Sequence, residues 1–223
     1  MTRILVVDYG KSNVQSVIKS LEQAGAEVTF SGAVESMRQA DAIVLPGVGS
    51  FADAARYMWA HEQAQALTEA LASGTPFLGI CLGAQLLMQS GSEGLPTPGD
   101  SLPGLGLIAG TVIRLESADA AGHRYKVPHV GWNQVHFSEP SDPNDRRLLA
   151  GLAPGSNLYF THSYRACPDD PRDILATAVH AQAIPAIIRR GLAYGVQFHP
   201  EKSSAKGLRF LSDFVQLAKA AWG

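Results

Sequence analysis

The sequence predicts an α/β fold with three αβα layers, built on an open, mostly parallel sheet with antiparallel additions. Through the first half, short apolar runs alternate with segments of helical periodicity, the pattern of a parallel sheet covered by helices on both faces. The second half contains short β-like segments separated by Gly, Pro and Asp clusters, which is typical of antiparallel strands. The 223 residues, 46% hydrophobic and 17% charged, suffice to bury one core, and we expect a single domain over 1–223.

The first half supplies the parallel strands and the helices between them. The first expected strand, 3–7, is a continuous apolar run, as in a sheet buried on both faces, and further strands are expected at 27–30, 42–45 and 76–80. Apolar residues recur at helical spacing over 14–21, and Gly25 follows, which predicts a helix that ends there. A helix-rich stretch is expected over 50–72, and a further helix over 82–89.

The second half is expected to add strands to the edge of the same sheet. Gly, Pro and Ser make 91–106 a loop, and 140–147 is predicted as a charged surface loop. The β-like segments are 111–115, 134–137, 157–161, 174–179, 186–189 and 192–197. A one-sided apolar set predicts a closing helix over 205–221.

Composition excludes several classes of function. Lysine plus arginine number 18 and aspartate plus glutamate 20, so nothing calls for nucleic acid or an anionic membrane as a partner. No apolar run approaches the roughly 20 residues that cross a bilayer. We expect a cytoplasmic protein, in which Cys81 and Cys167 stay reduced. The seven histidines lack paired ligand spacing, and no dinucleotide or phosphate-loop motif is present, so no metal and no cofactor are expected.

The strongest local motif is Gly-Ile-Cys-Leu-Gly at 79–83, between an expected strand and an expected helix. Flanking glycines permit the tight turn that lifts a nucleophile clear of the backbone. The Cys81 thiol would lie at a helix N-terminus, where the helix dipole favours the thiolate. The alternative is a buried structural cysteine, because a free cysteine usually acts as a small apolar residue.

A second motif, Gln-Phe-His-Pro-Glu at 197–201, follows the last expected strand. His199 can act as the base for Cys81, and Glu201 can orient its imidazole. The alternative is a surface histidine beside a carboxylate. That alternative loses weight because His199 and Cys81 both end strands, and triad partners meet in space rather than in sequence.

A third motif, Pro-Gly-Val-Gly at 46–49, follows a strand and precedes a helix. Taken alone it reads as an ordinary turn. Ligands in parallel sheets bind beyond the carboxyl ends of the strands, so this turn, the loop after Asp8 and the turn at Cys81 should lie along one edge. Beside Cys81, the 46–49 turn could supply a second backbone N–H to an oxyanion.

Together these motifs resemble the class I, triad-type glutamine amidotransferases. Within that class the chain is similar to the glutaminase subunits of imidazole glycerol phosphate synthase, the histidine-pathway enzyme. The matching segments span nearly the whole chain: Asp-Tyr-Gly at 8–10 with Asn13, then 46–51, 79–87, 128–133, 159–164 and 197–203. The Cys and His-Pro-Glu motifs indicate the class, and the Pro-Gly-Val-Gly, Gly-Trp-Asn and Phe-Thr-His-Ser-Tyr segments indicate the narrower group.

The resemblance implies a role for each matching residue. Cys81 would attack the glutamine carboxamide, with His199 moving protons and Glu201 holding His199. Val48 and Leu82 would donate backbone N–H groups to the oxyanion. The residues implied to position L-glutamine are Gly49, Gln85, His162 and Ser163. Those implied to lie at or near the contact with a (β/α)8 cyclase subunit, in a heterodimer, are Asn13, Trp132 and Lys202.

Two segments depart from the family pattern. Lys11-Ser12 stands where a glycine usually precedes Asn13, so a loop near the subunit contact is expected to differ. Residues 95–100 form an extended, proline-rich loop. Trp132 and Tyr159 could equally be core aromatics, which is the competing interpretation of the interface assignment.

Other functions remain open at this point. A paralogous glutaminase of surface-sugar biosynthesis keeps most of the same motifs. The glutaminase of pyridoxal phosphate synthesis usually carries a Gly-Gly-Glu-Ser loop, which is absent here. A glutaminase that has lost activity and serves only assembly is a third possibility, which the intact Cys81, His199 and Glu201 disfavour.

Overall fold

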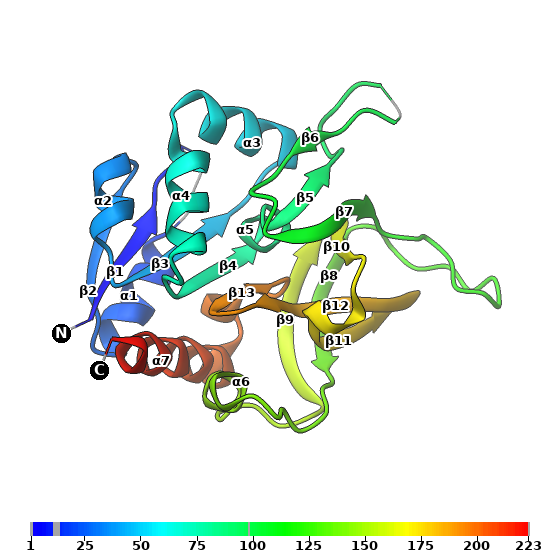
Figure 1. The fold of residues 1–223 in the computed structure, drawn as a ribbon. Coiled ribbons are helices and arrows are strands. Elements are labelled where there is room, and N and C mark those ends of the chain that lie inside the picture. The colour runs from blue at the N-terminus through cyan, green and yellow to red at the C-terminus, as the bar shows by residue number, and fades with distance from the viewer. Residues whose placement is uncertain (1, 11–13, 98, 223) are drawn as a thin grey trace.

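A seven-stranded sheet runs through the computed structural model, which describes residues 2–10, 14–97 and 99–222 (Figure 1). Its order is β11-β12-β13-β4-β3-β1-β2. The parallel strands are β1 (Arg3–Val7), β2 (Glu27–Ser31), β3 (Ala42–Gly47), β4 (Phe77–Cys81) and β13 (Ala193–Val196). The antiparallel strands β12 (Gln182–Arg190) and β11 (Ile174–His180) complete one edge. The predicted class, an open and mostly parallel sheet with antiparallel additions, is confirmed.

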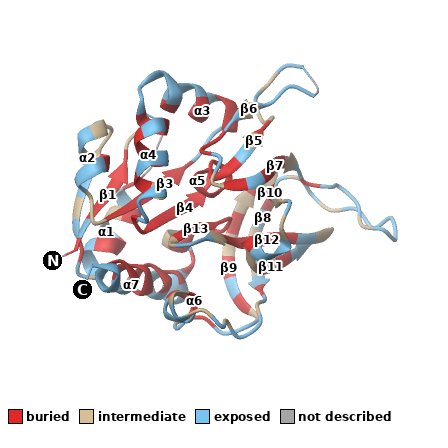
Figure 2. Ribbon diagram, in the orientation of Figure 1, coloured by how far each residue is buried: buried red, intermediate tan, exposed pale blue. Residues whose placement is uncertain are grey.

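Helices cover both faces of this sheet, as the sequence predicted (Figure 1). One face carries α1 (Gln15–Gln23) and α7 (Ser204–Ala221); the other carries α2 (Val34–Gln39), α3 (Phe51–Ala60) and α4 (Gln63–Ala72). Successive residues of β1 face opposite cores, since Ile4 and Val6 pack on one side and Leu5 and Val7 on the other. The buried residues accordingly lie between the layers (Figure 2). No helix within the described ranges is long and apolar enough to cross a bilayer.

The second half departs from the prediction, because most of its strands form separate sheets. A four-stranded sheet contains β5 (Met88–Gly91), β6 (Leu102–Pro103), β7 (Ile108–Arg114) and β10 (Tyr164–Pro168). A two-stranded ribbon pairs β8 (His129–Val135) with β9 (Ser156–His162). Of the predicted additions, only 174–179, 186–189 and 192–197 join the main sheet, and the last of these pairs with β4 in parallel.

Two predicted elements differ from the structure, one in its length and one in its type. The helix expected over 82–89 is the single turn α5 (Leu82–Gln85), after which the chain enters β5. There the chain pairs with β6 and β7, and Gly91 at the end of β5 packs so closely on Phe51 that an added Cβ would lie 2.8 Å from the ring. The loop expected over 140–147 contains the helix α6 (Pro143–Leu148). Its cap is the Asp142 side chain, which accepts the Asn144 N–H at 2.8 Å.

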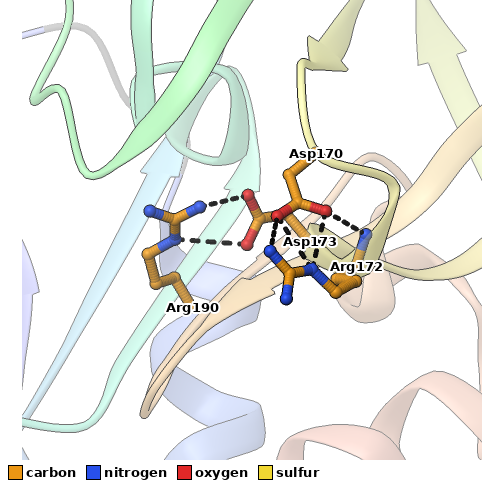
Figure 3. Close-up of polar contacts among 4 residues, drawn as sticks. All are labelled: Asp170, Arg172, Asp173 and Arg190. Atoms are coloured by element: carbon orange, nitrogen blue, oxygen red, sulfur yellow. Dashed lines mark hydrogen bonds and ion pairs between the residues drawn. The ribbon is translucent and has the colours of Figure 1, made fainter.

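The turn η1 (Pro171–Asp173) between β10 and β11 is held by two arginine–aspartate pairs (Figure 3). Arg190 of β12 contacts both carboxylate oxygens of Asp173, whose side chain is largely buried. Arg172 contacts Asp170 within the turn itself. The first pair ties the start of β11 to its neighbour β12, whereas the second is local and its arginine is exposed.

Candidate active site

The carboxyl ends of β3, β4 and β13 lie side by side, and a cavity of about 350 Å³ opens beside them. Gly47 at the end of β3 pairs directly with Cys81 at the end of β4. The predicted meeting at one edge is therefore confirmed for the 46–49 turn and the turn at Cys81, whereas part of the loop after Asp8 lies outside the described residues. The residues that line the cavity come from both halves of the chain: Val48, Gly49, Cys81, Leu82, Gln85, Glu93, Pro128, Thr161, His162, Ser163, Tyr164 and His199.

The turn at Cys81 has the strained form that the flanking glycines predict. Cys81 adopts φ 54° and ψ −104°, rare for a residue with a side chain, and it caps the N-terminus of α5. An added Cβ would lie 2.4 Å from the carbonyl oxygen of Gly83 at Gly79, and 1.8 Å from that of Leu45 at Gly83. Both glycines are therefore required for α5 to pack so closely on β3 and β4. The turn holds the thiol at the cavity wall.

His199 follows β13 and precedes the turn η2 (Pro200–Lys202). Its Nδ1–H donates to Glu201 Oε1 at 2.8 Å, and its backbone N–H donates to Tyr159 O at 2.8 Å. Burial by itself lowers the pKa of His199, but contact with Cys81 and with Glu201 outweighs burial and raises the pKa to about 9. A pKa in this range keeps the imidazole charged at neutral pH, and its Nε2 has no hydrogen-bond partner among the described residues.

The residues that carry the two backbone donors proposed from the sequence line this cavity. Leu82 is the first residue of α5, and Val48 and Gly49 follow the end of β3. Gly49 has φ 104°, a backbone conformation that favours glycine, so this turn requires a glycine at position 49. At Gly47 an added Cβ would lie 2.6 Å from the Tyr9 hydroxyl, so the loop that carries Val48 also packs closely on its neighbours.

The residues implied to position glutamine line the same cavity. Gln85 is buried, and its Nε2 donates to Tyr164 O at 2.8 Å. His162 is also buried, and its Nδ1 contacts the same carbonyl oxygen at 2.9 Å. The ring nitrogens His162 Nε2 and His129 Nδ1 lie 3.0 Å apart. Burial lowers the pKa of His162 to about 3 and that of His129 to about 4, so both rings are neutral at pH 7.

Glu93 is a cavity residue that the sequence analysis did not select. It is the only acidic residue among the described residues that line this cavity, and burial raises its pKa. It lies in the stretch predicted as a plain Gly/Pro/Ser loop, and nothing local distinguishes it from a surface glutamate. His129 was likewise named only within a matching segment, because its contact with His162 joins strands far apart in sequence.

The three residues implied for the subunit contact fare differently. Trp132 of β8 is 55% exposed and rests edge-on against the Tyr159 ring, so the core interpretation is wrong for Trp132. Lys202 is exposed and lines a smaller cavity that also touches Val48, His199 and Glu201. Asn13 and the Lys11-Ser12 departure lie outside the described residues.

Comparison with known proteins agrees with this geometry. The family Glutamine amidotransferase class-I matches residues 5–217. A solved structure described as a glutamine amidotransferase superposes with a TM-score of 0.70 at 17% identity, over 97% of this chain and 98% of that one. The structure of PurLQS from Thermotoga maritima gives a TM-score of 0.70 at 19% identity, over 100% and 99%. The chain belongs to the class I glutamine amidotransferases.

Sequence relatives define a narrower group within that class. The chain is 42% identical to the imidazole glycerol phosphate synthase subunit HisH of Geobacillus kaustophilus, over 96% of both chains. It is 43% identical to the subunit of the same name from Microcystis aeruginosa, over 97% of this chain and 96% of that one. The narrower resemblance drawn from the sequence is confirmed, and the chain falls within this HisH group.

Proposed function

We propose that this chain hydrolyses L-glutamine to glutamate and ammonia and passes the ammonia to a cyclase subunit. That partner would make imidazole glycerol phosphate and AICAR in histidine biosynthesis. The observation that carries the proposal is the strained turn at Cys81, which presents a thiol to a cavity beside the His199–Glu201 pair. The HisH relatives supply the narrower assignment of pathway and partner. A reducing cytoplasm, as predicted from the sequence, would keep this thiol free.

The reaction follows from the chemistry of these groups. The Cys81 thiolate attacks the carboxamide carbon of glutamine and forms a tetrahedral oxyanion, which the N–H groups of Leu82 and Val48 are proposed to hold. His199 gives its Nε2 proton to the leaving nitrogen, the C–N bond breaks, and ammonia departs from a γ-glutamyl thioester. His199 then takes a proton from water, whose oxygen attacks the thioester. Glutamate leaves, and the sulfur is free again.

Recognition of glutamine is proposed to rest on charge and on fixed hydrogen-bond donors and acceptors. Both N–H groups of Gln85 are used, by Tyr164 O and by Gln197 Oε1, so Gln85 offers only its carbonyl oxygen to a ligand. The Glu93 carboxylate would pair with the α-ammonium of the substrate. Ser163, His162 and Gly49 would contact the rest of the substrate.

The exposed apolar surface beside the cavity supports docking of a partner. Val130 and Trp132 of β8 are 57% and 55% exposed, and Val48 at the cavity itself is 46% exposed. Val130 and Trp132 lie two residues apart on β8 and so share one face of the strand, as neighbouring side chains of an interaction surface do. We propose that the (β/α)8 cyclase subunit covers this surface in a heterodimer, with Lys202 and Asn13 at the contact. Covering the cavity would keep ammonia from the solvent, where it is protonated.

The decisive experiment is a glutamate-release assay in the presence of the cyclase subunit. Cys81→Ala should abolish release, because loss of a triad nucleophile costs orders of magnitude in rate. Cys167→Ala is the matched control, since Cys167 lies on β10 and is not among the residues that line the cavity. Equal activity in Cys81→Ala and the parent chain would refute the proposed function.

A further inference from the structure

The sulfur of Cys81 is contacted by a buried glutamine, Gln197, to which the triad mechanism gives no role. Gln197 Nε2 lies 3.6 Å from Cys81 Sγ. The carbonyl oxygen of Gln197 accepts from Gln85 Nε2 at 3.1 Å, and Gln85 Nε2 also donates to Tyr164 O at 2.8 Å. Both glutamines are 3% exposed, so neither amide can exchange these partners freely for water.

The donor and acceptor roles in this series of hydrogen bonds, from Tyr164 through Gln85 and Gln197 to Cys81, are fixed at the Tyr164 end. Tyr164 O is a backbone carbonyl and can only accept, so the atom of Gln85 that faces it must be the amide nitrogen. That nitrogen also faces Gln197, which must therefore present its oxygen to Gln85. The remaining group of Gln197, its NH2, is then directed at the sulfur of Cys81. The backbone of β10 thus fixes the Cys81 sulfur as a hydrogen-bond acceptor.

We propose that Gln197 is a positioning residue that favours the thiolate of Cys81 and holds it in line with the cavity. The inference rests on the proposed function and deepens it. The Gln197 N–H points at the sulfur, and a thiolate accepts such a hydrogen bond more strongly than a thiol does. A hydrogen bond to a charged group favours the charged form by roughly tenfold to hundredfold, and a sulfur acceptor at this length suggests the lower end.

The same series of hydrogen bonds links the Cys81 sulfur to the cavity proposed to bind glutamine. Gln85 lines the cavity, and its only free polar atom is the carbonyl oxygen that a bound ligand would meet. A ligand that hydrogen-bonds to Gln85 and shifts its side chain would therefore also shift the Gln197 amide and, with it, the N–H that contacts the sulfur. Mutation can remove one of the two hydrogen bonds of Gln197 and keep the other, because its oxygen contacts Gln85 and its nitrogen contacts Cys81.

The test measures alkylation of Cys81 by iodoacetamide in the full chain carrying Cys167→Ala, which removes the other thiol. Gln197→Met removes both the N–H donor and the carbonyl acceptor of the amide. Gln197→Glu keeps the shape and the acceptor for Gln85, but it replaces the donor with a negative charge beside the sulfur. Gln63→Met is the matched control, because Gln63 is equally buried and donates to Asp8 O and Gly32 O.

We expect Gln197→Met to alkylate about tenfold more slowly than the parent at pH 7, with its rate profile moved to higher pH. Gln197→Glu should be slower still, and in the glutamate-release assay it should lower kcat with little change in KM. A purely structural role predicts the reverse order, since Gln197→Glu loses less packing and fewer hydrogen bonds. Gln63→Met should alkylate at the parent rate even if its urea midpoint falls.

Alkylation of both Gln197 variants within twofold of the parent would overturn the inference, as would equal slowing in Gln63→Met. Because the new charge of Gln197→Glu slows alkylation by itself, Gln197→Met carries the test, and Gln197→Leu, which also lacks the donor, replaces it if Gln197→Met lowers stability too far. Failure here is distinguishable from failure of the proposed function. An inactive Cys81→Ala with unaffected Gln197 variants leaves the glutaminase standing, whereas an active Cys81→Ala removes the proposed function itself.

Discussion

The neutral histidine pair beneath the cavity should make the protein less stable in mild acid. His129 and His162 are 5% and 6% exposed and contact one another at 3.0 Å. Burial lowers their pKa values to about 4 and about 3, whereas the same side chains in the unfolded chain titrate near the ordinary value of 6.5. Between pH 6.5 and 4 the unfolded chain therefore binds protons that the folded chain does not, and stability falls as pH falls.

Each histidine contributes a calculable share of that loss. With an unfolded pKa of 6.5 and a folded pKa of 4 or below, lowering the pH from 7.5 to 5.5 costs about 1.4 kcal/mol per histidine. Glu93, Asp145 and His199 act in the opposite direction, because their pKa values are raised in the folded chain. The pH dependence of the free energy of unfolding is therefore a sum over all these groups. The contribution of one histidine is obtained by comparing the parent with a variant that lacks it.

The assay is urea unfolding of the parent and of His129→Gln at pH 7.5 and 5.5. Glutamine can still donate to His162 and accept from Asn133, so the variant removes the titration while keeping partners. The parent should lose about 1.4 kcal/mol more than the variant over this interval, a midpoint difference of about 0.5–0.7 M for an m value of 2–3 kcal/mol/M. The exposed His136→Gln serves as control. Identical pH dependence in the parent and His129→Gln would refute the reasoning.

Three further results are expected. Glu201→Gln should retain part of the activity. As the pH rises, its activity should fall off at a lower pH than that of the parent, because Glu201 helps to raise the pKa of His199 to about 9, and a pH–rate profile measures this shift. Gly83→Ala should lower the free energy of unfolding by about 3 kcal/mol or more, measured in urea, because its Cβ would lie 1.8 Å from Leu45 O. The cyclase subunit with its nucleotide ligand should accelerate glutamate release by about 10²–10³, the worth of one oxyanion donor. Trp132→Ala or Lys202→Ala should weaken that acceleration more than stability, and full turnover without the partner would contradict it.

Motifs that act over a few residues were readable from the sequence. The Gly-x-Cys-x-Gly turn at 79–83 is one, because a Cβ at Gly79 would meet the carbonyl of Gly83 only four residues on, although the demand on Gly83 comes from Leu45 of β3. The histidine and carboxylate of His-Pro-Glu are another, since the ion pair joins residues only two apart. The carboxyl ends of parallel strands share an edge of the sheet, so the sequence alone predicts that these two motifs lie close together.

Other parts of the fold could not be read in this way. A short apolar strand carries no mark of which sheet it will join, and so the segment 111–115 was assigned to the wrong one. The helix expected over 82–89 failed because its apolar residues suit a buried strand as well as a buried helix. In each case the outcome depended on packing partners distant in the chain.

The sequence by itself determined the αβα class, the triad candidates and the edge of the sheet where they meet, because periodicity and tight turns are local steric properties. Only the tertiary structure decided which polar groups surround the sulfur and the cavity. Glu93 faces the cavity although its own loop is unremarkable, and Gln197 reaches Cys81 across 116 positions of chain. A buried polar side chain must find a partner wherever the fold brings one, and that partner is set by packing rather than by neighbours in sequence.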